Sequence, residues 1–457
     1  MTEPREADVV VIGLGPGGEE VAETLAKAGL DVVGIEAELV GGECPYWGCV
    51  PSKMMIRAAD SLAEARRVPE LSGASTVTPD FGIVAARIRD DATDNWDDTV
   101  AVDRFTGLGG TFVRGRGRLL SAHEVAVGDE VFRARRGVVI ATGTTALVPG
   151  IPGLAGTPFW TNREAIAAEQ PPESLIVVGG GAIGLELGQA FSRFGTEVTV
   201  VEGGPRLLPL EEPEAGATIA EVFREEGIGV LTGVSVDRVA YSNGVFSVEA
   251  SGTEVRATNL LIATGRRASP AAVGAETIGV PADARALPVD GQLRVAGVDG
   301  VWAVGDITGK GAFTHVAVYQ ARIAVRDILG DPGPSADYAA LSRVTFTDPE
   351  VGSVGLSEEQ ARRDGLNVAV GFTTTASSSR GWIHKAGNAG FIKVVADMDS
   401  GVLVGATSCG PVGGEVLGAL AVAVSARVPI ETLRHMIYAY PTFHRGIEDA
   451  LADLGSG

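Results

Sequence analysis

Two cysteines five residues apart form the most reactive feature of the sequence. The segment from residue 41 to 53 reads Gly-Gly-Glu-Cys-Pro-Tyr-Trp-Gly-Cys-Val-Pro-Ser-Lys. Cys44 and Cys49 can close a small disulfide ring if the backbone turns between them, and the intervening glycine gives the chain that freedom. Residues 50–59 are predicted to be helical, so Cys49 would lie at a helix N-terminus, where the dipole stabilises a thiolate. The pair therefore indicates thiol redox chemistry.

Structural thiols and a metal site are the alternatives for this pair. Burial as an inert side chain is the commoner fate of a cytosolic cysteine. No further Cys/His cluster nearby completes four ligands, so we expect no metal. The redox interpretation is favoured because the pair directly follows the pattern of a nucleotide-binding unit.

That unit is a predicted β-α-β segment with a glycine-rich turn. Residues 8–13 form a buried strand, a helix follows the turn, and residues 31–36 form a second strand. The turn carries a G-x-G-x-x-G motif, formed by Gly13, Gly15 and Gly18. Backbone N–H groups of such a turn can approach a pyrophosphate at the helix N-terminus. Glu36, which lies 23 residues after Gly13, can accept hydrogen bonds from a ribose.

The same pattern occurs a second time. Predicted strands at residues 175–179 and 197–202 flank a predicted helix at 182–194, and the motif glycines are Gly179, Gly181 and Gly184. Glu202 lies 23 residues after Gly179, the spacing found in the first unit. Two intact sites favour a flavin together with a nicotinamide over one working and one vestigial site. A carboxylate at Glu202 favours NADH because it would repel the 2′-phosphate of NADPH, although Arg206 could soften this preference and keep NADPH possible.

Further repeats outline the domains. Residues 138–143 and 260–265 read Val-Val-Ile-Ala-Thr-Gly and Leu-Leu-Ile-Ala-Thr-Gly, and each is predicted to close a nucleotide-binding domain. A Pro/Gly-rich stretch at 148–156 is a predicted linker. After about residue 341, short strand-like runs alternate with predicted helices at 415–426 and 430–437, which indicates a separate α+β domain.

Composition excludes several classes of function. The 457 residues carry a net charge of −21, which disfavours binding to nucleic acid or anionic membranes. Three cysteines are too few for a secreted disulfide framework, and we find no signal peptide and no run of 18 apolar residues. We therefore expect a cytoplasmic enzyme that acts on a small-molecule substrate.

The whole chain resembles the flavin disulfide reductase family, which includes glutathione reductase, dihydrolipoamide dehydrogenase and mercuric reductase. The resemblance rests on the order of the motifs and on the cysteine segment. It implies an α/β fold with two Rossmann-like, three-layer ββα nucleotide-binding domains and an α+β dimerisation domain that forms a homodimer with shared active sites. The expected division is an FAD-binding domain at 1–150 and 268–340, an NAD(P)-binding domain at 151–267 and a dimerisation domain at 341–457.

The resemblance also implies roles for individual residues. Cys49 would be the thiolate beside the flavin, Cys44 the thiol that meets substrate, and Lys53 with Glu186 an ion pair beside the flavin N5. Asp306 matches the acid that binds the ribityl chain of FAD. The expected cofactor-binding residues are Gly13, Gly15, Gly18, Glu36, Gly42, Lys53, Thr142, Gly143, Gly179, Gly181, Gly184, Glu202, Gly265 and Asp306.

The chain departs from this family near its C-terminus. Disulfide reductases carry His-Pro-Thr-x-x-Glu there, and the histidine serves as the acid/base for thiol–disulfide exchange in the partner subunit. Here the segment reads Tyr440-Pro-Thr-Phe-His-Arg445. Tyrosine ordinarily titrates near pH 10, so Tyr440 is a poorer proton shuttle at neutral pH than a histidine. The neighbouring His444 is either a replacement base or a structural residue, and His315 and His384 are interpreted as structural.

Several substrates are therefore open. We expect an enzyme that uses the Cys44–Cys49 disulfide to reduce an unusual disulfide, with Tyr440 or His444 adapted to it. The alternatives are a metal-ion or quinone reductase, and a carboxylating, thioether-cleaving relative that also lacks the His–Glu pair.

Overall fold

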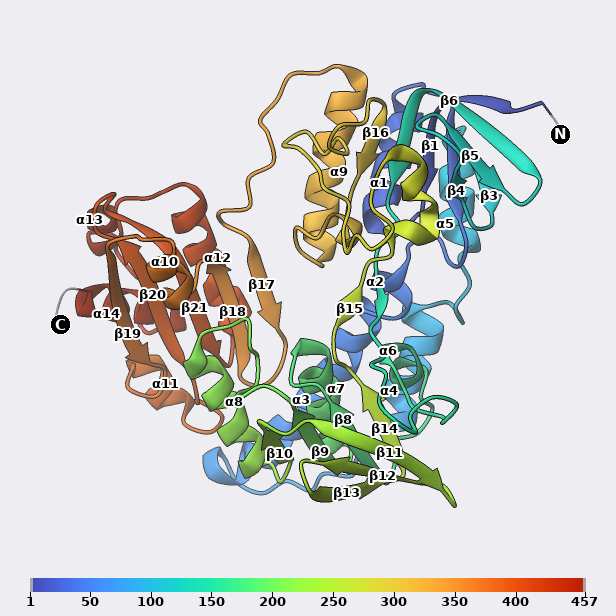
Figure 1. Ribbon diagram of the computed structural model, residues 1–457. Helices are drawn as coiled ribbons and strands as arrows, with labels where there is room; N and C mark the ends of the chain where they lie inside the picture. Colours follow the sequence, from blue (N-terminus) through green and yellow to red (C-terminus); the bar gives the residue numbers. More distant parts are fainter. Residues whose placement is uncertain (1–2, 455–457) are drawn as a thin grey trace. The chain divides into compact units, whose positions relative to one another are not determined.

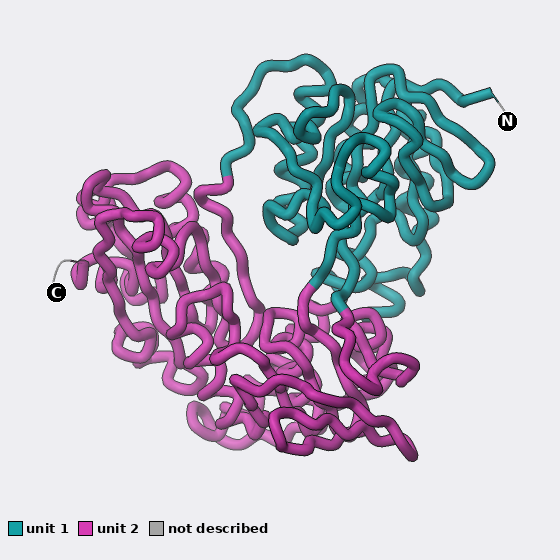
Figure 2. Tube along the Cα trace, viewed as in Figure 1, with its two compact units in different colours: residues 1–51, 86–147, 266–337 teal, residues 52–85, 148–265, 338–457 magenta. Residues whose placement is uncertain are grey.

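The protein divides into two compact units in a computed structural model that describes residues 3–454. Figure 2 colours the two units along the chain. The first unit consists of residues 1–51, 86–147 and 266–337, and the second consists of residues 52–85, 148–265 and 338–457. Each unit is therefore built from three separate stretches of sequence.

The first unit is organised around a seven-stranded sheet with a parallel centre (Figure 1). β1 (Arg5–Ile12) lies between β2 (Val32–Glu36) and β6 (Glu130–Ile140), and it pairs in parallel with both. The remaining strands of this sheet are β3 (Thr111–Arg114), β4 (Arg118–Leu119), β5 (Glu124–Val127) and β16 (Val301–Ala303). A separate two-stranded ladder joins β7 (Thr145–Ala146) to β15 (Arg266–Arg267).

Both faces of this sheet are covered, which explains the continuous apolar run in β1. Val9 and Val11 point to a core shared with α1 (Pro16–Lys27) and α9 (Thr314–Leu329), while Val10 and Ile12 point to a core beneath β4 and β5. The other helical elements that lie in or begin in this unit are α2 (Glu43–Tyr46), α3 (Cys49–Leu71), a π-helical turn η1 (Ile88–Ala92), α5 (Thr99–Gly107) and the 3₁₀ turns η2 (Pro270–Val273), η3 (Ala275–Ile278) and η4 (Asp306–Thr308). This is the predicted three-layer arrangement.

The second unit contains a parallel sheet of the same type. Its strand order is β10-β9-β8-β14, and an antiparallel sheet of β11, β12 and β13 packs on it through a shared apolar core. The bounds are β8 (Ser174–Val178), β9 (Glu197–Glu202), β10 (Gly229–Thr232), β11 (Val236–Ser242), β12 (Val245–Ala250), β13 (Thr253–Ala257) and β14 (Asn259–Ile262). The helices of this part, in addition to the rest of α3, are α4 (Phe81–Arg87), α6 (Asn162–Ile166), α7 (Ala182–Arg193) and α8 (Pro213–Glu225).

The last part of the second unit is a five-stranded antiparallel sheet with helices on its apolar face. The strand order is β17-β18-β21-β20-β19. The bounds are β17 (Ser342–Thr345), β18 (Glu350–Gly355), β19 (Val368–Thr374), β20 (Phe391–Asp397) and β21 (Val402–Gly410). The helical elements are α10 (Glu358–Arg363), α11 (Ser379–His384), α12 (Gly413–Ser425), α13 (Ile430–Arg434), the 3₁₀ turn η5 (Phe443–Arg445) and α14 (Gly446–Asp453). Together these elements form the predicted α+β domain.

One predicted helix is longer than the observed one. The sequence pattern predicts a helix over residues 430–437, but α13 ends at Arg434. The hydroxyl of Tyr438 donates to the Leu433 carbonyl and so satisfies a carbonyl at the end of the helix. Tyr440 therefore lies on the loop between α13 and η5, whereas His444 and Arg445 lie in η5.

Candidate active site

The third glycine of each motif is required by the turn itself. A Cβ atom at Gly18 would lie 1.9 Å from the Gly13 carbonyl oxygen, and a Cβ atom at Gly184 would lie 2.4 Å from the Gly179 carbonyl oxygen. Both distances are far too short for any side chain. The close approach of strand and helix that the two motifs predict is therefore present in both units.

The middle glycine of each motif lies beside open space. Gly15 and Gly181 are the N-cap residues of α1 and α7, and neither cap uses a side chain. Among the described residues, a Cβ at Gly181 would have no neighbour within 4 Å, and a Cβ at Gly15 would meet only the Cα of Gly42 at 4.0 Å. Packing against protein does not demand glycine there, whereas an anion at the helix N-terminus does. The two turns therefore fit the pyrophosphates of FAD and of a pyridine nucleotide.

The acid at the end of the second strand is held in the same way in both motifs. Glu36 accepts hydrogen bonds from the backbone N–H groups of Leu14 and Glu38, each at 2.8 Å. Glu202 accepts from Gly180 at 2.6 Å and from Gly204 at 2.5 Å. Burial raises the pKa of Glu36, against the pull of these N–H donors. Each carboxylate is thus fixed at the end of its strand, beside the glycine turn.

The two cysteines are neighbouring thiols in the first unit. Cys44 lies in α2 and is half-buried, whereas Cys49 is the first residue of α3 and is exposed. The hydrogen bond that Cys44 shares with Cys49, together with burial, raises the pKa of Cys44 well above its usual value. A thiolate at Cys44 is therefore disfavoured. The third cysteine, Cys409, is buried in β21, and burial raises its pKa to about 12.

Asp306 is part of a polar chain that the sequence did not predict. Its carboxylate accepts a hydrogen bond from the Thr144 hydroxyl at 2.7 Å, and Arg266 donates to the same hydroxyl at 2.8 Å. Arg266 also faces Glu43 at 3.5 Å. Thr142 and Gly143 lie on the loop between β6 and β7, and Gly143 has a positive φ of 61°. The hydrogen bond between Thr144 and Asp306 thus connects the loop after β6 to η4, which begins at Asp306.

In the second unit the structure brings Lys53 and Glu186 together. The Lys53 Nζ lies 2.8 Å from a Glu186 carboxylate oxygen. The other oxygen of Glu186 accepts a hydrogen bond from the Phe346 N–H at 2.8 Å, and the Lys53 ammonium lies 4.6 Å from the centre of the Phe346 ring. Glu186 is buried, where an unpaired carboxylate would destabilise the fold. Both of its oxygens have partners, so its charge is compensated.

Comparison with known protein families shows which family the chain belongs to. The model of the pyridine nucleotide-disulphide oxidoreductase family matches residues 7–321. The model of the dimerisation domain of these enzymes matches residues 341–451. The chain belongs to the pyridine nucleotide-disulphide oxidoreductase family. It is accordingly an FAD-dependent oxidoreductase that uses a pyridine nucleotide.

Individual relatives cover nearly the whole oxidoreductase. Mercuric reductase of Acidithiobacillus ferrooxidans is 34% identical over 455 residues, which are 97% of this chain and 82% of that protein. Dihydrolipoyl dehydrogenase of Chlorobaculum tepidum is 33% identical, over 98% of this chain and 96% of that protein. The Cu(II) complex of HOCl-induced flavoprotein disulfide reductase RclA from Escherichia coli matches with a TM-score of 0.86 at 26% identity, and covers 98% of this chain and 99% of that one.

The segment that departs from other disulfide reductases is open to solvent in the single chain. The Tyr440 side chain is 67% exposed, and the Arg445 guanidinium lies over its ring at 5.4 Å. Arg445 also pairs with Glu448 at 3.1 Å, and His444 is exposed. Of the other histidines, His384 packs edge-on against Phe443, and burial lowers its pKa. Arg445 is thus held by Glu448 and by the ring of Tyr440.

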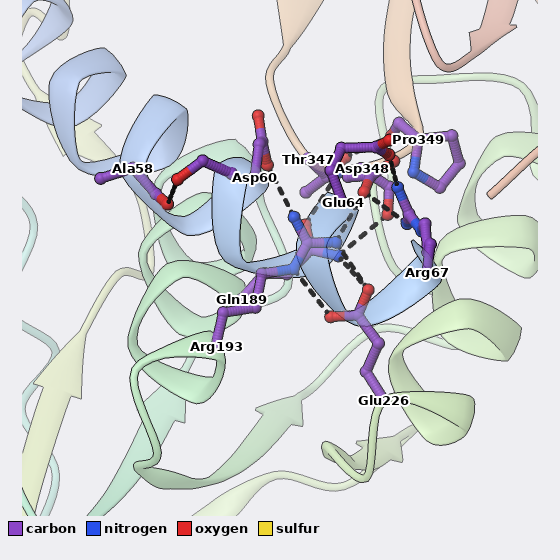
Figure 3. A network of polar contacts seen from close by, with 11 residues as sticks. Ala58, Asp60, Glu64, Arg67, Gln189, Arg193, Glu226, Thr347, Asp348 and Pro349 are labelled. Atoms are coloured by element: carbon purple, nitrogen blue, oxygen red, sulfur yellow. Dashed lines mark hydrogen bonds and ion pairs between the residues drawn. The ribbon is translucent and has the colours of Figure 1, made fainter. Parts of the chain in front are cut away.

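A polar network ties four segments of the second unit together (Figure 3). Arg193, near the end of α7, is almost fully buried and forms ion pairs with Asp60 at 2.6 Å, Glu226 at 2.6 Å and Asp348 at 2.7 Å. Arg67 also pairs with Asp348, at 2.7 Å. The network therefore joins α3, α7, the end of α8 and the segment after β17. Three of these, α3, α7 and the segment after β17, also carry Lys53, Glu186 and Phe346.

Removing the charge of Asp348 is expected to lower the stability of the protein, whereas removing the charge of Asp60 is not. The pKa of Asp348 is lowered from its ordinary value. Burial by itself would raise this pKa, but the positive charges of Arg193 and Arg67 have the larger effect. Asp348→Asn is therefore expected to cost about 3–5 kcal/mol of unfolding free energy at neutral pH, because it removes a counterion shared by two arginines. Asp348 contributes stability above its ordinary pKa of 3.8, and this contribution is lost as the pH falls through the lowered value.

The matched control is Asp60→Asn. Burial raises the pKa of Asp60 to about 6 despite the nearby Arg193. The folded protein thus gains stability from protonated Asp60 below pH 3.8 and loses it as the pH rises through about 6. Asp60→Asn is expected to leave stability unchanged or raised near neutral pH. Urea unfolding at about pH 7.5 and about pH 4.5 measures both variants, and equal losses at pH 7.5 would contradict the assignment.

Several of these contacts could not be predicted. Thr144, Arg266 and the Phe346 backbone are polar groups whose partners lie far away in the sequence. The same holds for the Thr314 hydroxyl of α9, whose oxygen lies 3.5 Å from the Cys49 Sγ. Within residues 3–454, no cluster of three His, Cys, Asp or Glu side chains could hold a metal ion. In that same range no helix is long and apolar enough to cross a membrane.

Proposed function

We propose that the enzyme takes electrons from NADH through FAD to the Cys44–Cys49 pair, and that this pair reduces a thiophilic metal ion such as Cu(II) or Hg(II). The observation that carries the proposal is the pair of neighbouring thiols, one exposed, at the start of α3. Thiolates are soft ligands that select soft metal ions. FAD, when bound, supplies hydride acceptance from the nicotinamide and electron transfer to the sulfurs.

Proton balance favours a metal ion over a disulfide. Oxidation of NADH yields two electrons and one proton. Reduction of a disulfide to two thiols consumes two electrons and two protons, so the overall reaction takes up one proton and needs an acid at the site. Reduction of Hg(II) to Hg(0), or of two Cu(II) to two Cu(I), consumes only the electrons, so the overall reaction releases one proton. A site with Tyr440 and Arg445 in place of the histidine and glutamate lacks the usual proton donor, so it suits the reduction of a metal ion, which needs no proton.

The relatives support the same substrate class. One is named for mercuric ion, and a structural neighbour is a Cu(II) complex. Both are similar to this chain over almost its full length. An unusual disulfide stays the second candidate, because the exposed His444 of η5 could supply a proton in place of Tyr440.

The decisive experiment measures protons and electrons together. Purified enzyme with FAD is given NADH without oxygen, together with Cu(II), Hg(II), a small disulfide or a quinone. NADH loss is followed by absorbance and proton release or uptake by a pH-stat. Turnover with a metal ion and release of one proton for each NADH supports the proposal. Fast turnover of a common disulfide with proton uptake, and none with metals, would exclude it.

We also propose that the nucleotide domain binds NADH in preference to NADPH. Residues 151–267 are the proposed NAD(P)-binding domain, and FAD belongs to residues 1–150 and 268–340. The Glu202 carboxylate is fixed by the N–H groups of Gly180 and Gly204, where it would face a 2′-phosphate. The Arg206 guanidinium is engaged by the carbonyl oxygens of Leu208 and Pro209 at 2.8 and 3.0 Å.

We expect kcat/KM to be at least about tenfold higher with NADH than with NADPH, because a fixed carboxylate repels the phosphate. Glu202→Ala should narrow this ratio, chiefly by improving NADPH. Arg206→Ala is the control and should leave the ratio unchanged, since its side chain already binds the loop. A selective loss of NADPH activity in Arg206→Ala would show instead that Arg206 binds the phosphate.

A homodimer with shared active sites is part of the proposal. The chain carries the dimerisation domain of its family, and within it the apolar side chains of Met436 and Ile437 are 46% and 97% exposed. Val422, on α12, is also exposed. Apolar groups of this size suit burial against a second copy. In such a dimer Tyr440 would face the cysteine pair of the partner subunit.

A further inference from the structure

A short segment of the first unit, residues 93–98, contacts the turn that separates the two cysteines. We call it the clamp segment. The indole rings of Trp96 and Trp47 stack with their centroids 5.3 Å apart, and both side chains are half-buried. The Trp96 Nε1–H also donates a hydrogen bond to the Tyr46 carbonyl at 3.3 Å. A single side chain of the clamp segment therefore touches two neighbouring residues of the cysteine turn.

The clamp segment also holds the chain before the cysteines. The buried Asp98 carboxylate accepts a hydrogen bond from the Val40 N–H at 2.7 Å. The same carboxylate pairs with Arg114 of β3 at 2.5 Å, which ties it to the central sheet of the unit. Contacts from the clamp segment thus fix the backbone on both sides of Cys44.

The backbone of the clamp segment is strained. Asp94, Asn95 and Trp96 have φ angles of 47°, 56° and 57°. Asp and Asn tolerate this left-handed region, but a bulky side chain rarely adopts it, and a glycine would do so without strain. Strained residues persist where surrounding contacts fix them, and they cluster at functional sites. The turn itself does not require tryptophan, so its contacts with the cysteine turn account for the indole at this position.

We propose that Trp96 is a positioning residue that holds the cysteine turn in the geometry from which the Cys44–Cys49 disulfide closes. Closure removes two electrons and two protons from the two thiols and forms one S–S bond. In turnover the electrons pass to the substrate and the protons to water. The inference rests on the proposed redox role of the pair, and its test needs neither NADH nor a substrate.

A clamped turn favours closure because it keeps the two sulfurs together before the bond forms. The thiols already share a hydrogen bond in this structure. Gly48, just before Cys49, gives the turn backbone freedom that would let the sulfurs separate. Contacts from outside the turn remove that freedom in the dithiol state, so less conformational entropy is lost when the ring closes.

The test compares Trp96→Gly, which accepts a positive φ and removes the indole, with Trp96→Phe, which keeps a stacking ring. The FAD-loaded proteins are equilibrated without oxygen at several ratios of reduced to oxidised dithiothreitol. Free thiols are trapped with N-ethylmaleimide, and mass spectrometry counts the adducts on Cys44 and Cys49. The equilibrium constant for closure should fall about tenfold in Trp96→Gly, because the stack and the hydrogen bond are both lost. This makes the reduction potential about 30 mV less negative.

Trp96→Phe should lower the same constant by less than about threefold, because only the hydrogen bond is lost. The matched control is Trp160→Phe. It removes an indole N–H in the second unit, where the Trp160 ring packs against Phe191, and should leave the constant unchanged.

The outcomes separate this inference from the proposed function. An unchanged constant in Trp96→Gly, even with a lower urea midpoint, overturns the inference and leaves the proposed function intact. A native pair that forms no disulfide at any ratio removes both. A lowered constant in an enzyme that reduces no metal ion upholds Trp96 and removes the proposed substrate.

Discussion

Cys49→Ser is expected to lower NADH-dependent reduction of Cu(II) or Hg(II) by about 10³-fold or more. A serine hydroxyl does not ionise near neutral pH and is not a soft metal ligand, so the pair loses both its electron donor and its binding site. The variant should still accept electrons from NADH, because the nucleotide motifs are untouched. Its reduced form should lack the charge-transfer absorbance, whereas Cys44→Ser should keep that absorbance and lose metal reduction.

The third cysteine provides the matched control for this experiment. Cys409 is buried in β21 and stays protonated, because burial raises its pKa to about 12. Cys409→Ala should therefore keep both metal reduction and the absorbance band. Stopped-flow spectra with NADH and steady-state rates with each metal ion give the two readouts. Metal reduction that persists in Cys49→Ser while the band is lost would mean that electrons leave from the flavin directly.

Restoring the family's acid/base pair is expected to raise activity on small disulfides by about 10²-fold. The variant is Tyr440→His with Arg445→Glu, and the gain comes from a proton delivered to the departing thiolate. Metal reduction should change by less than about twofold, since it needs no such proton. Rates with glutathione disulfide, lipoamide and a metal ion measure the two effects side by side.

The structure improves the design of this variant. Arg445 pairs with Glu448 at 3.1 Å, so a carboxylate at position 445 would repel Glu448 three residues further along the chain. Glu448→Gln should be added to remove this repulsion. Tyr440→Phe with Arg445→Gln is the control that removes the native groups without supplying a base. Strong native activity on a common disulfide, lost in His444→Ala, would show that His444 is the proton source.

Mixed dimers show whether the new histidine acts across subunits. One chain carries Cys49→Ser together with the restored pair, and the other carries native cysteines and the native segment. Neither homodimer should reduce a small disulfide well, because one lacks the thiolate and the other lacks the acid. A mixed dimer gains activity only if the segment of one subunit serves the cysteines of the other. No gain would place each segment in its own subunit or exclude the dimer.

The short motifs of the sequence determined the family, and they predicted both glycine turns and the cysteine pair. Gly18 and Gly184 are required by contacts within a single turn, and Glu36 and Glu202 follow their turns at a fixed spacing. Such features depend on a few dozen neighbouring residues, so spacing alone predicts them. The buried run of β1 is predictable for the same reason, since a strand covered on both faces is apolar throughout.

The tertiary structure alone decided which polar groups support these motifs. Thr314 lies 265 residues from Cys49, and the Phe346 N–H lies 160 residues from Glu186. Packing of separate elements brings these groups together, and no local spacing marks a threonine or a backbone N–H as a partner of a distant sulfur or carboxylate. The opposite behaviour of Asp60 and Asp348 has the same origin, because it depends on burial and on the arginines that each carboxylate faces. Sequence therefore determines which reactive groups this protein has, and the fold decides their charge and their partners.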